Sequence, residues 1–84
     1  MKPMAAHIRT PDQLIHALKR HRQLQDMTQS DLGESAGLPQ TTISKIEVGM
    51  IDPSLSTLFK LLAAFDLEIE IKEKRSRARL KKDG

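Results

Sequence analysis

The feature that most constrains this chain lies at its centre, where two short apolar-periodic segments are joined by a glycine. Thr28 can begin the first segment as an N-cap, and Gly37 can end it in the left-handed conformation that glycine adopts without strain. The second segment runs from Gln40 to about Val48. Two helices joined by so tight a turn must approach closely, and Gly33 supplies the small residue that this requires. The centre of the chain therefore predicts a helix-turn-helix unit.

Further helices are predicted on both sides of this unit. Thr10-Pro11 is a helix start signal, and apolar residues at helical spacing extend that helix to about Gln25. Ser54 can cap a fourth helix that ends near Phe65 or Asp66. Its apolar face is predicted from the i, i+3, i+4, i+7 spacing of Leu55, Leu58, Phe59 and Leu62. Leu61 and Phe65 are further apolar residues, a surplus beyond what one face of a small helical bundle needs. The predicted fold is all-α, with four or five helices.

Residues 67–72 change from helical to alternating periodicity. Leu67, Ile69 and Ile71 alternate with charged residues, which predicts a strand with one apolar face. No other segment predicts a strand, so its backbone groups lack a partner within the chain. We expect it to pair with the same strand of a second chain in a homodimer, with the surplus Leu61 and Phe65 covering the apolar face.

Length and composition exclude several protein classes. With 84 residues and no cysteine, the chain predicts one domain without disulfides or a cysteine-based zinc site. No apolar run is long enough for a membrane span and no apolar segment follows the N-terminus, so a cytoplasmic location is expected. The expected organisation is a flexible lead-in at 1–9, a folded domain at 10–66, a dimerisation strand at 67–72 and a basic, disordered tail at 73–84.

Positive charge is concentrated in that tail. Residues 73–84 contain six Lys and Arg residues against two acidic ones, although the whole chain has a formal charge of only +3. A charge block of this kind is typical of a solvated, disordered segment. It also fits an arm that binds phosphates, and the two interpretations are compatible.

Catalytic and metal chemistry find little support in the sequence. His7, His16 and His21 are the only candidate nitrogen ligands for a metal, and the five-residue spacing of the last two does not place them on one helical face. No cysteine or tight carboxylate cluster joins them, so packing or surface roles are expected. No glycine-rich phosphate loop or set of nucleophile and base is present. We therefore expect neither an enzyme nor a cofactor.

The central motif resembles the Cro/C1-type (XRE) helix-turn-helix of phage repressors. The resemblance covers roughly residues 10–66 and departs from the family at Gly33, where alanine is usual. It rests on the residues and spacing Thr28-Gln29, Leu32, Gly37, Ile43-Ser44, Ile46-Glu47 and Gly49, followed by Pro53 and Leu58.

The added strand and first helix make the whole chain similar to HipB-type antitoxins. The resemblance implies a lambda-repressor-like fold, transcriptional repression of its own operon and binding of a HipA-type kinase toxin. It also implies an ion pair between Arg22 and Glu47, because phage repressors of this family pair an arginine and a glutamate at these positions.

Docking of this motif on a roughly palindromic operator in double-stranded DNA would use the polar face of the second helix. Glutamine at its first turn, here Gln40, can pair with adenine. Thr41 and Thr42 either pack or touch a thymine methyl group or a phosphate. A backbone or phosphate contact is expected of Ser44, whereas Lys45 can bind either phosphate, the commoner partner, or guanine. The preceding helix start adds candidate phosphate contacts, so the predicted DNA-binding residues are Thr28, Gln29, Gln40, Thr41, Thr42, Ser44 and Lys45.

Two alternatives remain open on the sequence alone. One is a stand-alone Cro/C1-type regulator without a toxin partner. The other is a protein-interaction module whose DNA binding is vestigial. Neighbouring genes distinguish the first from an antitoxin, and a binding experiment on the DNA upstream of the gene distinguishes both from the second.

Overall fold

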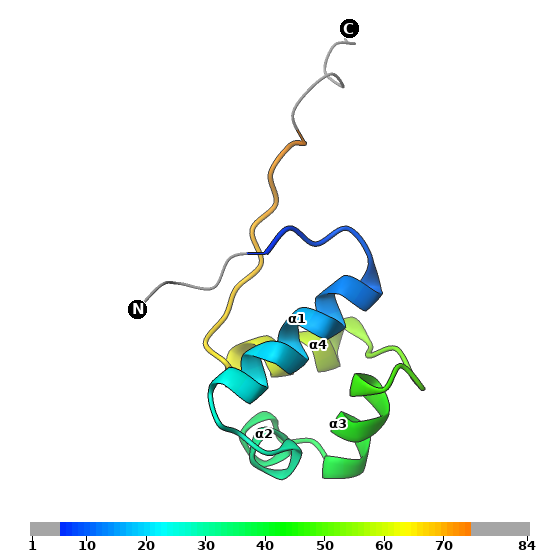
Figure 1. The fold of residues 1–84 in the computed structure, drawn as a ribbon, viewed down its shortest axis with the longest axis vertical. Coiled ribbons are helices and arrows are strands. Elements are labelled where there is room, and N and C mark those ends of the chain that lie inside the picture. The colour runs from blue at the N-terminus through cyan, green and yellow to red at the C-terminus, as the bar shows by residue number, and fades with distance from the viewer. Residues whose placement is uncertain (1–5, 75–84) are drawn as a thin grey trace, which may run out of the picture.

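A computed structural model describes residues 6–74 of the chain (Figure 1). Within this range the chain folds into four helices. They are α1 (Pro11–Leu24), α2 (Gln29–Ala36), α3 (Gln40–Glu47) and α4 (Leu55–Ala64). The prediction of an all-α domain is confirmed, at four helices within this range. None of these helices is long and apolar enough to cross a membrane.

Local capping explains where most helices begin and end. The first, second and fourth helices begin at hydroxyl N-caps whose oxygens accept a backbone N–H in the first turn, namely Thr10, Thr28 and Ser54. In α2 the cap is reciprocal, because the Thr28 backbone N–H also donates to the Asp31 carboxylate at 2.9 Å. Gly37 ends α2 at φ 72°, as its position predicts.

Gly33 lies where α2 meets the start of α3. A Cβ atom at this position would lie 2.6 Å from the backbone oxygen of Leu38 and 3.4 Å from the backbone nitrogen of Gln40. The Leu38 N–H donates to the Gly33 carbonyl oxygen at 2.8 Å, which closes the turn. Only glycine fits this crossing as it stands, so the glycine permits the close approach that the sequence predicts.

The hydrophobic core lies between the four helices. Ile43 of α3 is its most deeply buried member, with 1% of its surface exposed. The remaining buried apolar residues come from every helix and from the end of α4; they are Leu18, Leu32, Ala36, Ile46, Leu58, Leu61, Leu62 and Phe65.

The predicted apolar face of α4 needs a correction. Leu61 and Phe65 are only 3% and 9% exposed, whereas Leu55 and Phe59 are 73% and 53% exposed. The core face of α4 is therefore rotated from the predicted one, because this helix is apolar around most of its circumference. Leu61 and Phe65 belong to the chain's own core and are not a free cover for a dimerisation strand, so that part of the prediction is wrong.

Residues 67–74 leave the helical body as a segment that extends beyond the helices (Figure 1). The segment begins where the Leu67 N–H donates to the Leu62 carbonyl oxygen at 2.8 Å, with Asp66 in the left-handed region at φ 57°. No strand forms here within the single chain, because a strand requires a hydrogen-bonded neighbour. Ile69 and Ile71 are exposed, and the pairing of two chains stays a prediction.

The two ends of the chain lie largely outside this description. Residues 6–9 precede α1 without forming a helix, and residues 1–5 of the predicted lead-in lie outside the described residues. Most of the predicted basic tail also lies outside them, since only Glu73 and Lys74 of that segment are described.

Candidate nucleic-acid interface

The candidate interface is the outer side of α2 and α3, which the turn at Gly37 holds together. Gln40 and Thr41, in the first turn of α3, are exposed, as is Lys45 one turn later. The seven predicted DNA-binding residues all lie in α3 or in the first turn of α2 with its cap. Thr42 and Ser44 are half-buried, so each side chain packs partly against the protein and leaves part of its surface open to a DNA contact.

A chain of side-chain hydrogen bonds joins the two helices at this surface. The Gln40 Nε2 donates to Gln29 Oε1 at 3.0 Å, and the Gln29 Nε2 donates to Glu47 Oε1, also at 3.0 Å. The sequence pattern predicts a separate DNA contact for each of Gln29 and Gln40 and no contact between them. Contacts between polar residues on different helices leave no periodic signal in a sequence, so nothing in the pattern could have predicted this one.

Arg22 of α1 and Glu47 of α3 form the ion pair that the family resemblance implies. The Arg22 Nε donates to Glu47 Oε2 at 2.7 Å and its Nη2 donates to Oε1 at 3.0 Å, so the contact is bidentate. The two side chains are 10% and 6% exposed. A third donor, the Arg22 Nη1, reaches the Met27 carbonyl oxygen at 2.7 Å and ties the end of α1 to the start of α2.

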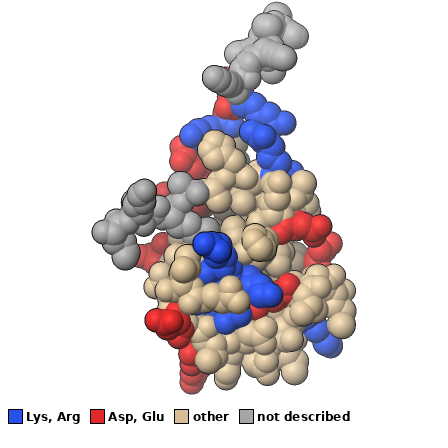
Figure 2. Space-filling model, viewed as in Figure 1, with Lys and Arg blue, Asp and Glu red and all other residues tan. Residues whose placement is uncertain are grey.

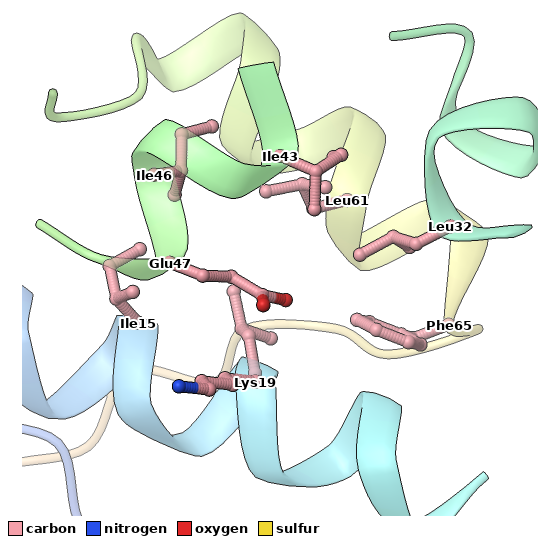
Figure 3. Close-up of a pocket in the computed structure, with 9 residues that line it drawn as sticks. Ile15, Lys19, Leu32, Ile43, Ile46, Glu47, Leu61 and Phe65 are labelled. Carbon is pink, nitrogen blue, oxygen red and sulfur yellow. The ribbon is translucent and has the colours of Figure 1, made fainter. Parts of the chain in front are cut away.

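Glu47 crosses from α3 into the space between α3 and α1, as the close-up in Figure 3 shows. It lines a small cavity there with apolar side chains, among them Ile15 and Phe65, and with Lys19. The cavity that these residues line has a volume of only about 10 Å³. A space of that size holds about one water molecule and is too small for an organic ligand. The role of Glu47 here is to join helices.

The cap of α2 has its own electrostatics. The Thr28 backbone N–H, followed by the Thr28 hydroxyl, stabilises the Asp31 carboxylate and holds its pKa below its ordinary value, while a slight desolvation opposes this effect. Asp31 therefore stays ionised at neutral pH and occupies the backbone N–H of the N-cap Thr28, placing a negative charge where a phosphate would approach the start of α2. This carboxylate weakens the predicted attraction of the α2 start for phosphate.

The charge of the surface is not that of a strongly basic DNA-binding patch. Residues 29–47 contain one lysine, Lys45, against three carboxylates, of which Glu47 is neutralised by Arg22. On the face drawn in Figure 2, the surface over α2 and α3 is largely free of charged side chains, which lie at its margins. Contacts to bases and neutral contacts to phosphates therefore fit this surface better than general attraction to a polyanion.

The three histidines occupy the positions expected of packing and surface residues. His7 and His16 are exposed, and the His21 ring packs edge-on against the Phe65 ring with centroids 5.0 Å apart. Within residues 6–74, no three side chains of the kinds that hold metal ions come together.

The model of a family described as helix-turn-helix matches residues 18–72. Antitoxin HipB of Escherichia coli O6:H1 is 39% identical to this chain over 64 residues, covering 76% of this chain and 68% of the antitoxin. An uncharacterized helix-turn-helix-type transcriptional regulator of Methanocaldococcus jannaschii is 43% identical over 53 residues, covering 63% of this chain and 80% of the regulator.

Solved structures of similar chains have the same fold as this chain. One chain of a HipA-HipB-O2-O3 complex superposes with a TM-score of 0.77 at 34% identity, over 84% of this chain and 100% of that chain. One chain of a HipB-O1-O2 complex superposes with a TM-score of 0.75 at 35% identity, over 82% of this chain and 100% of that chain.

Proposed function

This chain belongs to the helix-turn-helix family and is a regulator of the XRE type, and on that premise we propose that it represses its own operon as the antitoxin of a HipA-type kinase toxin. In this proposal it binds a roughly palindromic operator as a homodimer and also binds the toxin. Support comes from its similarity to HipB antitoxins and to chains whose structures contain HipA or operator DNA.

One observation carries the DNA-binding part of the proposal. Gln40 is exposed at the first turn of α3, and a hydrogen bond to Gln29 holds its amide at the outer face of the motif. Residues at the start of a recognition helix are the ones that contact base edges when this motif docks in the major groove. A glutamine held there has the donor and acceptor that adenine requires.

The experiment that tests it is a gel shift on the DNA upstream of the gene, with Gln40→Ala as the variant. Loss of a bidentate contact should weaken operator binding by about 1–3 kcal/mol and relax preference at one base pair. Gln23→Ala is the matched control, because Gln23 is an exposed glutamine of α1 outside the motif. Equal losses on operator and on random DNA would contradict a base contact, and no binding to either would leave a protein-interaction module.

Phosphate contacts are tested separately. Lys45 is exposed on α3, and Lys45→Ala should weaken all DNA sequences evenly if it contacts phosphate. Deletion of residues 73–84 should flatten the dependence of log K on log salt concentration by about 0.9 for each lost phosphate contact. An unchanged salt slope would assign the tail another role, such as solubility or toxin binding.

The homodimer is proposed to form through residues 67–72. Ile69 and Ile71 are 47% and 93% exposed in the single chain, and pairing with a second copy would satisfy their backbone groups. Ile69→Lys should lower dimer stability and operator affinity together, because each depends on the other by mass action. The matched control is Glu70→Lys, on the opposite side of the predicted strand. A sedimentation experiment that finds a monomer at micromolar concentration, with operator affinity intact in Ile69→Lys, would refute this dimer.

The toxin partner is the finer part of the proposal. Neighbouring genes provide the first check, since an antitoxin of this type requires an adjacent kinase gene. Co-expression with that gene's product should yield a complex that survives size-exclusion chromatography. The absence of both an adjacent kinase gene and a complex would leave a stand-alone regulator.

A further inference from the structure

We propose that Lys19 of α1 binds a phosphate of the operator backbone, at the seam where α1 lies against α3. The proposal rests on the DNA-binding function proposed above and deepens it, because it adds a contact from a helix outside the helix-turn-helix unit. The group that Lys19 recognises is a phosphodiester of the DNA and not a base, so the contact supplies affinity without sequence preference.

The helix-turn-helix unit is short of the positive charge that binding to a polyanion requires. Residues 23–44 contain no lysine or arginine, and they carry the exposed carboxylates of Asp26, Asp31 and Glu34. Lys45 is the one cation of α2 and α3. Phosphate contacts supply the sequence-independent part of DNA affinity and hold a protein in register on the duplex. A further cation beside these two helices is therefore expected.

Lys19 is the cation that the fold places beside α3. Its side chain lines the small cavity between α1 and α3, together with Ile46 and Glu47 of α3 (Figure 3). Lys19 precedes Arg22 by three residues, so the two side chains share one flank of α1. Arg22 ties that flank to α3 through Glu47 and to the start of α2 through the Met27 carbonyl oxygen. Lys19 therefore lies at the edge of the surface that α2 and α3 form.

The ammonium group of Lys19 is available for a phosphate. Arg22 neutralises Glu47 through two hydrogen bonds, and their pair is the only ion pair within residues 6–74. In Figure 3 the Lys19 amine points away from the Glu47 carboxylate. The Lys19 side chain is half-buried, an arrangement in which a lysine packs its apolar stem against the protein and keeps its charged end in water. A phosphate can therefore bind this amine without displacing a carboxylate.

Arg20 provides a contrast within the same helix. It is exposed and follows Lys19 directly, so its side chain projects about 100° further around α1. Arg20 does not line the cavity between α1 and α3. The two residues carry the same charge on different sides of one helix, so a comparison of them separates a local contact from general attraction to DNA.

The variants that test the contact are Lys19→Met, which keeps the apolar stem and removes the charge, and Arg20→Met as the matched control. Binding of operator DNA and of random DNA is measured over a range of salt concentrations. Lys19→Met should lower the slope of log K against log salt concentration by about 0.9 and weaken both DNAs about five- to tenfold near 0.1 M salt. Arg20→Met should change affinity by less than about twofold, because a charge without a direct contact is largely screened at this salt concentration.

Lys19→Arg should restore both the slope and the affinity, because arginine also binds phosphate. Thermal melting followed by circular dichroism verifies that Lys19→Met is folded, so that a lost contact is not confused with lost structure. An unchanged slope in folded Lys19→Met, or an equal fall in slope for Arg20→Met, would overturn the proposal.

A footprint of the lysine amines tests the contact in the unaltered protein. Acetic anhydride acetylates accessible amines, and mass spectrometry measures the modification of each lysine with and without operator DNA. Operator should cause a loss of reactivity at Lys19 but not at Lys60, an exposed lysine of α4 outside the candidate interface. Equal reactivity of Lys19 with and without bound operator would refute the contact and leave DNA binding itself intact. A failure of the unaltered protein to bind either DNA would instead refute the proposed function, and the contact with it.

Discussion

Removal of Arg22 from its ion pair should be among the most damaging single changes to the stability of this protein. In Arg22→Met, Glu47 would lose two charge-assisted hydrogen bonds, of 2.7 Å and 3.0 Å, and keep only the neutral donor of Gln29. The Glu47 side chain is only 6% exposed, so water can replace little of this loss. Leaving a buried charge without its partner costs about 3–5 kcal/mol.

The size of the effect makes it readily measurable. In a chain of this length, each kcal/mol lowers the melting temperature by about 4–8 °C, so Arg22→Met should melt at least about 12 °C lower. The chain has no tryptophan or tyrosine, so the assay is urea and thermal unfolding followed by helical circular dichroism. The paired change Arg22→Met with Glu47→Met provides the control, because an apolar pair of similar volume leaves no stranded charge.

The comparison of these variants decides whether the argument is correct. The double variant should recover most of the loss and unfold within about 1–2 kcal/mol of the unaltered protein. Both variants lose the contact of Arg22 with the Met27 carbonyl oxygen, so that term cancels in the comparison. A cost below about 1 kcal/mol for Arg22→Met, or a double variant as unstable as the sum of the single ones, would refute the reasoning.

Three further predictions concern local features. Because the pKa of Asp31 is lowered in the folded state, its ionised carboxylate stabilises the protein at pH values above the pKa of Asp31 in the unfolded chain, and this stabilisation is lost as the pH falls through the folded-state pKa. The free energies of unfolding of Asp31→Asn and of the unaltered protein, plotted against pH, should therefore converge in acid. Parallel plots would contradict this. Asp66→Gly should raise stability by up to about 1 kcal/mol by urea unfolding, because Asp66 has a positive φ at the end of α4, whereas Asp66→Ala should lower it. Ile43→Ala should cost about 2–5 kcal/mol in the same assay because Ile43 is 1% exposed, while the exposed Leu55→Ala should cost under about 1 kcal/mol.

The features that could be predicted from sequence are those set by local chemistry. The caps at Thr10, Thr28 and Ser54 depend on a hydroxyl and a backbone N–H three residues later, so a few consecutive residues carry the information. Gly37 is predictable for the same reason, since its positive φ is a property of one residue. The order of the four helices followed from these signals.

The face of α4 and the contacts of the site could not be predicted in this way. Apolar residues surround most of α4, so spacing alone placed Leu55 and Phe59 in the core, whereas packing against the other helices chose Leu61 and Phe65. The Arg22–Glu47 pair followed from the family resemblance and not from any pattern in the chain. The contact of Gln29 with Gln40 depends on the crossing of two helices, which sequence spacing does not specify.

The absence of room at Gly33 has a consequence for anyone who engineers new DNA specificity into this protein. The space that an alanine methyl group would need is taken by the Leu38 carbonyl oxygen and the start of α3. A relative that carries alanine at this position needs room for the methyl group, which the turn before α3 in this chain does not leave. Grafting residues 40–47 from such a relative would transfer the base-contacting side chains but not the orientation of the helix that presents them. A faithful transplant therefore has to include α2, its turn and α3 as one unit.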